Sequence, residues 1–229
     1  MRTRDVIILL IVPVAIFTWL YFLIKGPSYD QPARYLEKLK AGRYVSLVFL
    51  GDSITFGYGE SDNYVYRFRK RLKGSQYFDR TRVYNAGIVG DTAAGGLARL
   101  DSTVLIYKPD LVYVAFGGND LKNRIPVGDF KRDLTSIVRK LQEQGCDVMV
   151  MTMPVFNIPL AGKVCKPYNR AIQEVSKETG AGLVDVNQAY RKEIGWFGDA
   201  GKFMQADNIH PNSEGHRIIV SRINQSLGL

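Results

Sequence analysis

The sequence predicts an α/β protein, a three-layer α/β/α sandwich with a central parallel five-stranded sheet, preceded by an N-terminal transmembrane helix. Three observations lead to this prediction. Several short runs are apolar on both faces of an extended chain, as in a parallel sheet that helices cover on both sides. Amphipathic stretches alternate with these runs, which is typical of right-handed strand–helix–strand units. One charge-free run near the N-terminus is long enough to cross a bilayer.

That charge-free run covers residues 6–24 and would reach roughly 28 Å as a helix. Trp19 and Tyr21 lie toward one end of it, where interfacial aromatic side chains are favoured. A cleaved signal peptide is the main alternative, but its apolar core is usually shorter and small residues mark its cleavage site. A helix packed on the core of a globular domain of this size would usually carry a polar stripe on its solvent side, which this run lacks. We therefore expect a membrane anchor.

The flanking charges predict how the anchor is oriented. Arg2 and Arg4 precede the run and Lys25 follows it, so the positive-inside rule places the N-terminus in the cytoplasm. We expect a single-pass membrane protein with the domain that follows the anchor outside the cytoplasm, or a secreted protein if the segment is cleaved. The expected organisation is an anchor over residues 1–25, a linker with a first helix over 26–40, and one domain over 41–229.

The five predicted strands follow in chain order, and each ends before a glycine, a polar residue or a turn. They cover residues 44–50, 82–84, 111–116, 147–151 and 182–186. The helices between and after them are indicated by apolar residues at three- and four-residue spacing and by glycine stop signals. They cover residues 63–73, 127–144, 167–179 and 213–227.

Composition excludes some functions and leaves others open. The net charge is +9, but no long block of like charge indicates a nucleic-acid surface. The basic charge is compatible with an anionic membrane or envelope polymer, and equally with an ordinary soluble surface. Cys146 and Cys165 are the only cysteines, and the sequence leaves open whether they pair or are simply buried. The oligomeric state is also left open.

The polar residues that follow the strands indicate where chemistry takes place, because function gathers beyond the carboxyl ends of parallel strands. Ser53 follows the first strand in GDSITFG, and a serine needs a neighbouring base to become a nucleophile. Of the two histidines, His216 falls inside the last predicted helix and is interpreted as structural. His210 follows Asp207 at a spacing of three, which can place the carboxylate against the imidazole.

Each of these signals has a structural alternative. Ser53 alone could be a helix N-cap, a common role for serine after a strand, and Asp-x-x-His occurs by chance in many proteins. Gly87 and Asn119 follow the next strands in NAGIVGDT and GGND. A glycine N–H and an asparagine NH₂ both suit a developing oxyanion, although an asparagine in a loop more often bonds nearby backbone.

With these four blocks in order, the chain resembles the SGNH hydrolases, also called GDSL-type lipases and esterases. The blocks are GDSITFG, NAGIVGDT, GGND and DNIHPN, and the resemblance spans about residues 45–215. It implies a flavodoxin-like fold and hydrolysis of carboxylic esters or thioesters through an acyl-enzyme, with no metal or organic cofactor.

The resemblance also implies residue roles. Ser53 would be the nucleophile, His210 the general base and then acid, and Asp207 the orienting carboxylate. The N–H groups of Ser53 and Gly87 and the side chain of Asn119 would form the oxyanion hole. We expect two further aspartates of the same blocks to brace the site without entering the chemistry, namely Asp52 and Asp120.

Other function classes predict features that the sequence does not contain. A nucleotide binder predicts a Gly-x-Gly-x-x-Gly or phosphate-loop motif, and a zinc hydrolase predicts clustered histidines and carboxylates. A non-catalytic envelope-binding module predicts loss of a catalytic residue. The substrate is expected to be a small-molecule, lipid or glycan ester. The chain resembles the compact bacterial lysophospholipase and thioesterase branch, and an acetylesterase acting on envelope glycans is the alternative.

Overall fold

The computed structural model describes residues 32–196 and 198–228. Its centre is one five-stranded sheet in which every pair of neighbouring strands is parallel, in the order β2-β1-β3-β4-β5. The strands are β1 (Val45–Gly51), β2 (Thr81–Gly87), β3 (Leu111–Ala115), β4 (Asp147–Met151) and β5 (Gly182–Val184). This is the flavodoxin-like strand order, in which strands are added first on one side of β1 and then on the other, so that the switch point lies between β1 and β3.

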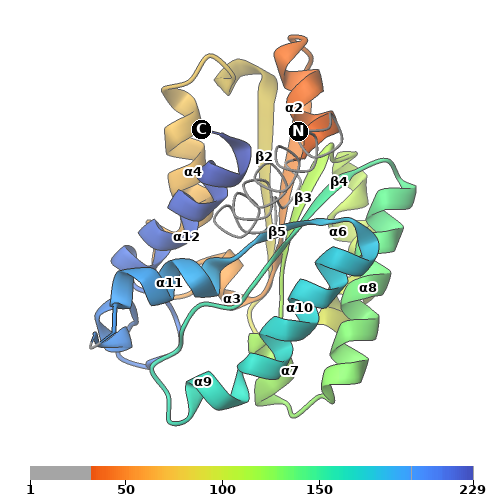
Figure 1. Cartoon of the computed structure of the whole chain (residues 1–229). Coiled ribbons are helices and arrows are strands. Elements are labelled where there is room, and N and C mark those ends of the chain that lie inside the picture. The colour runs from red at the N-terminus through yellow and green to blue at the C-terminus, as the bar shows by residue number, and fades with distance from the viewer. Residues whose placement is uncertain (1–31, 197, 229) are drawn as a thin grey trace, which may run out of the picture.

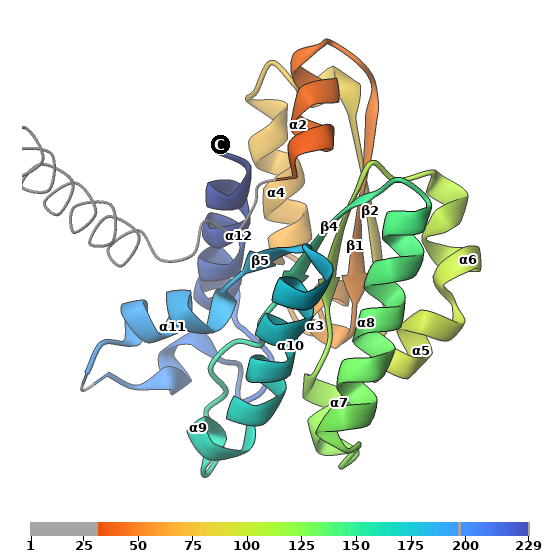
Figure 2. The same ribbon diagram turned by 45° about the vertical axis from the view of Figure 1, so that its right-hand side comes forward.

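Helices cover both faces of this sheet and form the two outer layers (Figures 1 and 2). The longer helices are α2 (Ala33–Lys40), α4 (Tyr64–Lys73), α8 (Val127–Glu143), α10 (Lys166–Thr179), α11 (Val186–Ile194) and α12 (Ser213–Leu227). The shorter ones are α3 (Ser53–Phe56), α5 (Ala93–Ala98), α6 (Leu100–Thr103), α7 (Gly118–Lys122) and α9 (Ala161–Val164). Three 3₁₀ turns complete the described chain, at Phe78–Arg80, Leu105–Tyr107 and Ala200–Phe203. The predicted three-layer α/β sandwich with a parallel five-stranded sheet is confirmed.

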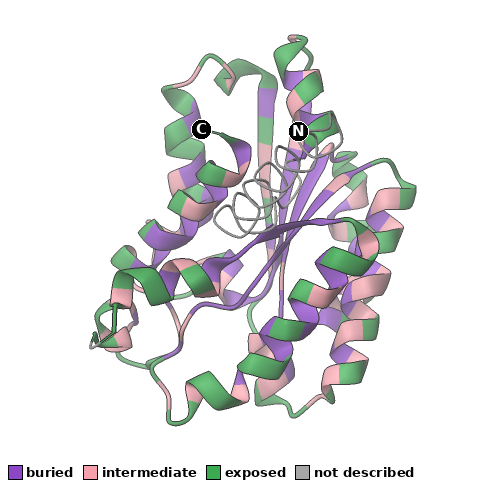
Figure 3. Cartoon of the chain, viewed as in Figure 1, coloured by how far each residue is buried: buried purple, intermediate pink, exposed green. Residues whose placement is uncertain are grey.

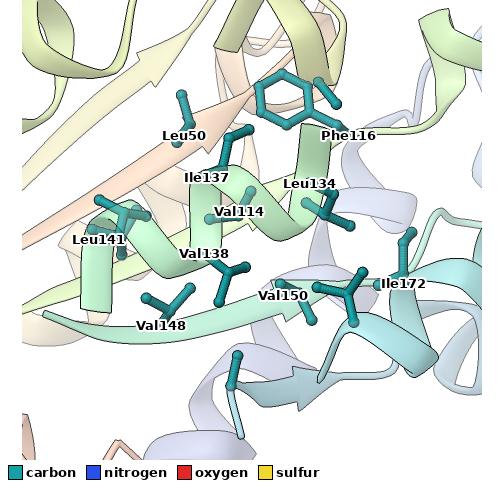
Figure 4. Packing of buried hydrophobic residues seen from close by; sticks show 14 of the residues in the cluster. Leu50, Val114, Phe116, Leu134, Ile137, Val138, Leu141, Val148, Val150 and Ile172 are labelled. Atoms are coloured by element: carbon teal, nitrogen blue, oxygen red, sulfur yellow. The ribbon is translucent and has the colours of Figure 1, made fainter. Parts of the chain in front are cut away.

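Alternate side chains of the strands form two cores, one on each face, so β1, β3, β4 and β5 are buried along most of their length (Figure 3). On one face, α8 packs five apolar side chains into the core, namely Phe130, Leu134, Ile137, Val138 and Leu141. Figure 4 labels the last four of them. On the other face, Phe49 is completely buried and its ring lies 5.5 Å from the rings of Tyr64 and Phe68 of α4. This two-sided burial is what the continuous apolar runs predicted.

Helix α2 lies at the end of the sheet opposite the predicted site, and polar contacts fix it there. The Tyr35 N–H donates to Asp147 Oδ2 at 2.8 Å, and Lys38 pairs with Asp110 at 2.5 Å. Tyr35 and Leu39 are buried in the same core as α4 and α12. The first described helix is therefore packed on the sheet by both apolar and charged contacts.

The predicted element bounds hold where apolar periodicity was strong and fail where it was weak. The bounds of β4 and α12 are those predicted. Strand β2 runs over 81–87, longer than the predicted 82–84, because it is an edge strand with partly exposed side chains. The predicted strand 182–186 ends at Val184, since the Asp185 side chain accepts from the Gln188 N–H and begins α11.

The predicted membrane anchor lies outside the described residues, as does the first part of the predicted linker. Within residues 32–196 and 198–228, no helix combines the length and the apolar character that a membrane crossing requires.

Candidate active site

Ser53 lies directly beyond the carboxyl end of β1, at a corner that two neighbours shape. It is the first residue of the one-turn helix α3, whose N-cap is Asp52; the Asp52 side chain accepts from the Ile54 N–H at 2.9 Å. Gly57 then ends the helix in the left-handed conformation, with φ +92°. Asp52 therefore caps the helix, and the alternative interpretation of Ser53 as the N-cap is wrong.

Ser53, His210 and Asp207 form one hydrogen-bonded chain. The Ser53 Oγ lies 2.9 Å from His210 Nε2, and His210 Nδ1 lies 2.5 Å from Asp207 Oδ2. The other Asp207 oxygen accepts from the N–H groups of Ile209 and His210, at 3.0 and 2.9 Å. The Asp207 carboxylate thus holds the loop and orients the imidazole. As the three-residue spacing predicted, the carboxylate lies against the His210 ring.

The electrostatics of this loop favour an ionised carboxylate. Partial burial raises the pKa of Asp207. The hydrogen bonds from the His210 ring and from the two N–H groups together lower this pKa by more than burial raises it, so the net shift is downward. An Asp207 carboxylate stabilises an imidazolium at His210 more effectively than a neutral acid would. The Tyr58 ring packs beside the imidazole at a centroid distance of 4.7 Å. The His210 carbonyl also accepts from the Gln205 N–H.

Asn119 lies at the carboxyl end of β3, in the short helix α7. One hydrogen of its Nδ2 is donated to the Asp91 carbonyl at 2.9 Å, which leaves the second hydrogen for another acceptor. Both Asn119 and Ser53 line the same cleft. As the first residue of α3, Ser53 also has a backbone N–H without an intrahelical acceptor.

Gly87 does not present a free donor. Its N–H is donated to Asn85 Oδ1 at 2.9 Å, so the hydrogen that was predicted to serve an oxyanion is already used. A Cβ at this position would lie 2.2 Å from the Phe56 backbone nitrogen. The structure therefore gives Gly87 a packing role, namely allowing β2 and α3 to approach closely.

The second glycine of the same block lies where a free donor is possible. Gly90 has φ +81° in a turn closed by the Asp91 N–H and the Ile88 carbonyl, and a Cβ there would meet no atom within 4 Å. No acceptor for the Gly90 N–H is found among the described residues. The bond from Asn119 to the Asp91 carbonyl holds this turn next to Asn119. The signal in the sequence was NAGIVGDT itself, which contains both glycines.

An ion pair that no sequence pattern predicted ties the turn to the sheet. Arg99 Nε lies 2.7 Å from Asp91 Oδ2, and only 13% and 11% of the two side chains are exposed. Arg99 also donates to the Gly51 carbonyl, at the end of β1, at 3.2 Å. Arg99 thus links the strand that precedes Ser53 with the turn that contains Gly90. An eight-residue separation in sequence gave no indication of this contact.

Asp52 and Asp120 are buried beside the reacting groups. Burial raises the pKa of Asp52 to about 7, against the lowering effects of the Ile54 N–H and of His210. Burial likewise raises the pKa of Asp120, which accepts from the Ala93 N–H at 3.1 Å. Asp52 thus caps the helix of Ser53, and Asp120 holds the start of α5.

The remaining residues named from the sequence lie away from the reacting atoms. His216 is 1% exposed in α12, and its Nδ1 accepts from the Tyr64 N–H at 3.3 Å. Cys146 and Cys165 are free and buried. Across residues 32–196 and 198–228, no three His, Cys, Asp or Glu side chains are grouped to hold a metal ion.

The cleft that contains Ser53 and His210 has a volume of about 230 Å³ and is largely apolar. Its floor and walls include one residue of α3, one of α7, two of the loop after β4 and one of the histidine loop: Ile54, Leu121, Phe156, Ile158 and Ile209. A hydrocarbon chain that leaves water for such a surface is stabilised by about 0.8 kcal/mol per buried CH₂. The cleft is therefore suited to an apolar group next to the serine.

Comparisons with known proteins show which family the sequence and the fold resemble. The sequence model of the GDSL-like Lipase/Acylhydrolase family matches residues 49–218. Esterase TesA of Pseudomonas aeruginosa is 33% identical over 72% of this chain and 79% of its own. Thioesterase 1/protease 1/lysophospholipase L1 of Escherichia coli K12 is 27% identical over 80% and 84%. The crystal structure of an acetylxylan esterase from Geobacillus stearothermophilus shares the fold with a TM-score of 0.70, 23% identity, and coverage of 82% and 95%.

Proposed function

The chain belongs to the GDSL-like lipase/acylhydrolase family and is a carboxylic ester hydrolase; from this premise we propose that it cleaves carboxylic esters or thioesters through an acyl-enzyme formed on Ser53. The observation that carries the proposal is the chain from Ser53 Oγ to His210 Nε2 at 2.9 Å and on to Asp207. A serine hydroxyl with a base at that distance, and a base oriented by a carboxylate, has the arrangement of an activated nucleophile.

The first half of the reaction forms the acyl-enzyme. Ser53 Oγ attacks the ester carbonyl carbon while His210 Nε2 accepts the hydroxyl proton, giving a tetrahedral oxyanion and an imidazolium that Asp207 stabilises. The carbon–oxygen bond to the leaving alcohol, or the carbon–sulfur bond to a thiol, then breaks. His210 returns its proton to the leaving atom, and the acyl group stays on Ser53.

The second half releases the acid. Water attacks the acyl-enzyme while His210 takes its proton, and the second tetrahedral intermediate expels Ser53 Oγ, which recovers the proton from His210. The products are a carboxylic acid and the free enzyme.

For the oxyanion we propose three donors: the Ser53 N–H, the Asn119 side chain and the Gly90 N–H. Support for Gly90 in place of Gly87 comes from the hydrogen bonds, because the Gly87 N–H is donated to Asn85 while the Gly90 turn is held beside Asn119. Donors that are fixed before the reaction stabilise a developing oxyanion without reorganisation. Asp52 supports the donor of Ser53 by capping α3, and Asp120 supports the segment after Gly90 by accepting from the Ala93 N–H.

For the acyl group we propose a medium or long hydrocarbon chain, as in lysophospholipids or acyl thioesters. The apolar lining of the 230 Å³ cleft supports this, because an acetyl group would leave most of that surface uncovered. An acetylesterase that acts on envelope glycans is the second candidate. A structural neighbour is an acetylxylan esterase, but at 23% identity that likeness concerns the fold alone.

We also propose that residues 1–25 anchor the protein in a membrane and that the catalytic domain lies outside the cytoplasm. Support comes from the charge-free run at residues 6–24 and from the arginines before it. The full-length protein should stay with the membrane fraction after an alkaline wash. Its release into the medium as a shortened chain would instead show a cleaved signal peptide.

The test of the reaction is a hydrolysis profile of the full-length protein on p-nitrophenyl esters of increasing acyl length, beside the Ser53→Ala variant. Ser53-dependent turnover that peaks at medium or long chains supports the proposal. A peak at acetate selects the acetylesterase. Turnover that persists in Ser53→Ala contradicts the assignment of the nucleophile.

A further inference from the structure

A second depression lies beside the catalytic cleft and is lined by residues of the loop that follows β4 and of helices α9, α10 and α11. Figure 1 shows where these elements lie in the fold. Its volume is about 670 Å³, larger than that of the cleft. We call it the basic groove, because its charged lining residues are Lys166, Arg170 and Arg191. Among the residues that the structure describes, no aspartate or glutamate lines it.

Two of the three cations are free to meet a ligand. Neither Lys166 nor Arg191 forms an ion pair with any described residue. Arg191 Nε donates to Asn187 Oδ1 at 2.8 Å, which orients the guanidinium while leaving its terminal NH₂ groups available.

The third cation is only partly neutralised. Arg170 pairs with Glu174 at 3.0 Å, but the same carboxylate also pairs with Lys131 at 2.9 Å. Another carboxylate, Asp185, is buried next to the groove and accepts hydrogen bonds from Thr152, from the Gln188 N–H and, at 3.4 Å, from the groove residue Gln173. The groove therefore has an excess of positive charge, in a chain whose net charge is +9.

The groove and the catalytic cleft meet at one side chain. Phe156 lines both of them and is 5% exposed, so its ring forms the wall that the two depressions share. A molecule that reacts at Ser53 can therefore place an apolar part against Ile54 and Leu121 and a polar part beyond Phe156.

We propose that the basic groove binds a phosphate or phosphodiester on the leaving-group side of the substrate, so that the enzyme prefers esters whose alcohol carries such an anion. This rests on the proposed function, since it assigns a subsite for the alcohol of the same ester. Arginine forks and lysine ammonium groups are the usual partners of phosphate oxygens. The groove is open to solvent, so each contact is modest, and we expect a preference of about tenfold.

The test compares two soluble esters with the same acyl chain, 1-octanoylglycerol and 1-octanoylglycerol 3-phosphate, on the full-length protein. The phosphate ester should have about tenfold higher kcat/KM, mostly through KM, and the advantage should shrink as salt rises. In the double variant Lys166→Gln/Arg191→Gln the ratio of the two kcat/KM values should approach one. Arg139→Gln, on α8 outside the groove, is the matched control and should keep the ratio.

Three results would overturn the subsite. They are equal kcat/KM for the two esters, an undiminished preference in the double variant, and a preference that Arg139→Gln removes equally. An octanoyl ester of 2-phosphoethanol, which lacks the glycerol of a lipid, distinguishes a general phosphate site from a lipid headgroup site. If this ester also has the higher kcat/KM, the groove recognises any alcohol that carries a phosphate. If its kcat/KM is not raised, the groove requires the glycerol as well as the anion.

A binding measurement separates failure of the subsite from failure of the proposed function. Titration of the Ser53→Ala protein with glycerol 3-phosphate should show saturable binding that the double variant loses. Binding without Ser53-dependent hydrolysis of either ester would mean that the proposed function is wrong while the groove binds anions. Hydrolysis without any binding or preference would mean that the groove assignment alone is wrong.

Discussion

The two histidines of the chain lie six residues apart but in opposite environments. His210 is in the loop before α12, with 18% of its side chain exposed and each ring nitrogen within hydrogen-bond distance of a partner, Ser53 or Asp207. His216 is inside α12, 1% exposed, and accepts a single hydrogen bond from the Tyr64 N–H. Burial lowers the pKa of His216 to about 3, with Arg67 and His210 adding to the effect.

This difference shows how surroundings assign a role to one side chain. A general base must gain and lose a proton within one turnover, so it needs an acceptor nitrogen at the reacting atom and a partner that stabilises the charged ring. His210 has both. His216 has neither, because a proton on its ring would be buried without a carboxylate and would break the bond from the Tyr64 N–H. The region around His210 is built for proton transfer, and that around His216 for packing.

The largest effect expected from this comparison is on turnover at the first histidine. His210→Ala should lower kcat by about 10⁴-fold or more, as should Ser53→Ala, because attack and proton transfer act as a unit. The double variant Ser53→Ala/His210→Ala should lose little beyond either single change. Steady-state hydrolysis of a p-nitrophenyl ester measures all three. Near-full activity in His210→Ala, or losses that multiply in the double variant, would contradict the shared role.

The contrast between the histidines was accessible from the sequence, and the oxyanion donors only in part. The three-residue spacing from Asp207 and the helical pattern around His216 are local, and local patterns predicted both environments. Which glycine of NAGIVGDT is free is not a local property. It depends on Asn85 taking the Gly87 N–H and on Asn119 holding the neighbouring turn.

The same distinction between local and non-local properties explains which strand and helix bounds could be predicted. Strands buried on both faces, such as β4, have an apolar pattern that fixes their ends. The edge strand β2 and the short helices around the site have no such pattern, because tertiary contacts set their bounds. The pair of Arg99 and Asp91 and the meeting of two depressions at Phe156 likewise require the folded chain.

The second effect in size concerns the side chain that completes the oxyanion site. Asn119→Ala should lower kcat by roughly 10²–10³-fold with a small change in KM, as loss of one oxyanion donor does. It removes a group that acts only in the transition state, whereas the histidine change removes the base itself. The control is the melting temperature, which shows whether the lost bond to the Asp91 carbonyl disturbs the fold. A loss under about threefold would mean that Asn119 only supports the turn.

A smaller effect is expected where the contact with the site is indirect. Arg99→Gln should lower kcat by about 10- to 100-fold with little change in KM, because the Gly90 turn loses its link to β1 and its donor is misplaced in the transition state. Arg99→Lys keeps the charge and should recover part of the loss. A fall in melting temperature with unchanged kcat in the folded fraction would make Arg99 purely structural and would restrict the catalytic region to the direct contacts.

The smallest effect on turnover is expected at the second histidine, where the change appears in stability. The folded pKa of His216, about 3, lies below the usual 6.5, so between these values the unfolded chain binds a proton that the folded protein does not. Stability is therefore lost as pH falls from about 6.5 toward 3, by ~3 kcal/mol between pH 7 and pH 4 from this group.

His216→Gln keeps an acceptor for the Tyr64 N–H but cannot titrate. Urea unfolding at pH 7, 5 and 4 should show a shallower loss in the variant than in the wild type, with kcat at pH 7 nearly unchanged. Parallel pH profiles would mean that folding does not lower the pKa of His216, and the contrast drawn between its environment and that of His210 would then be wrong.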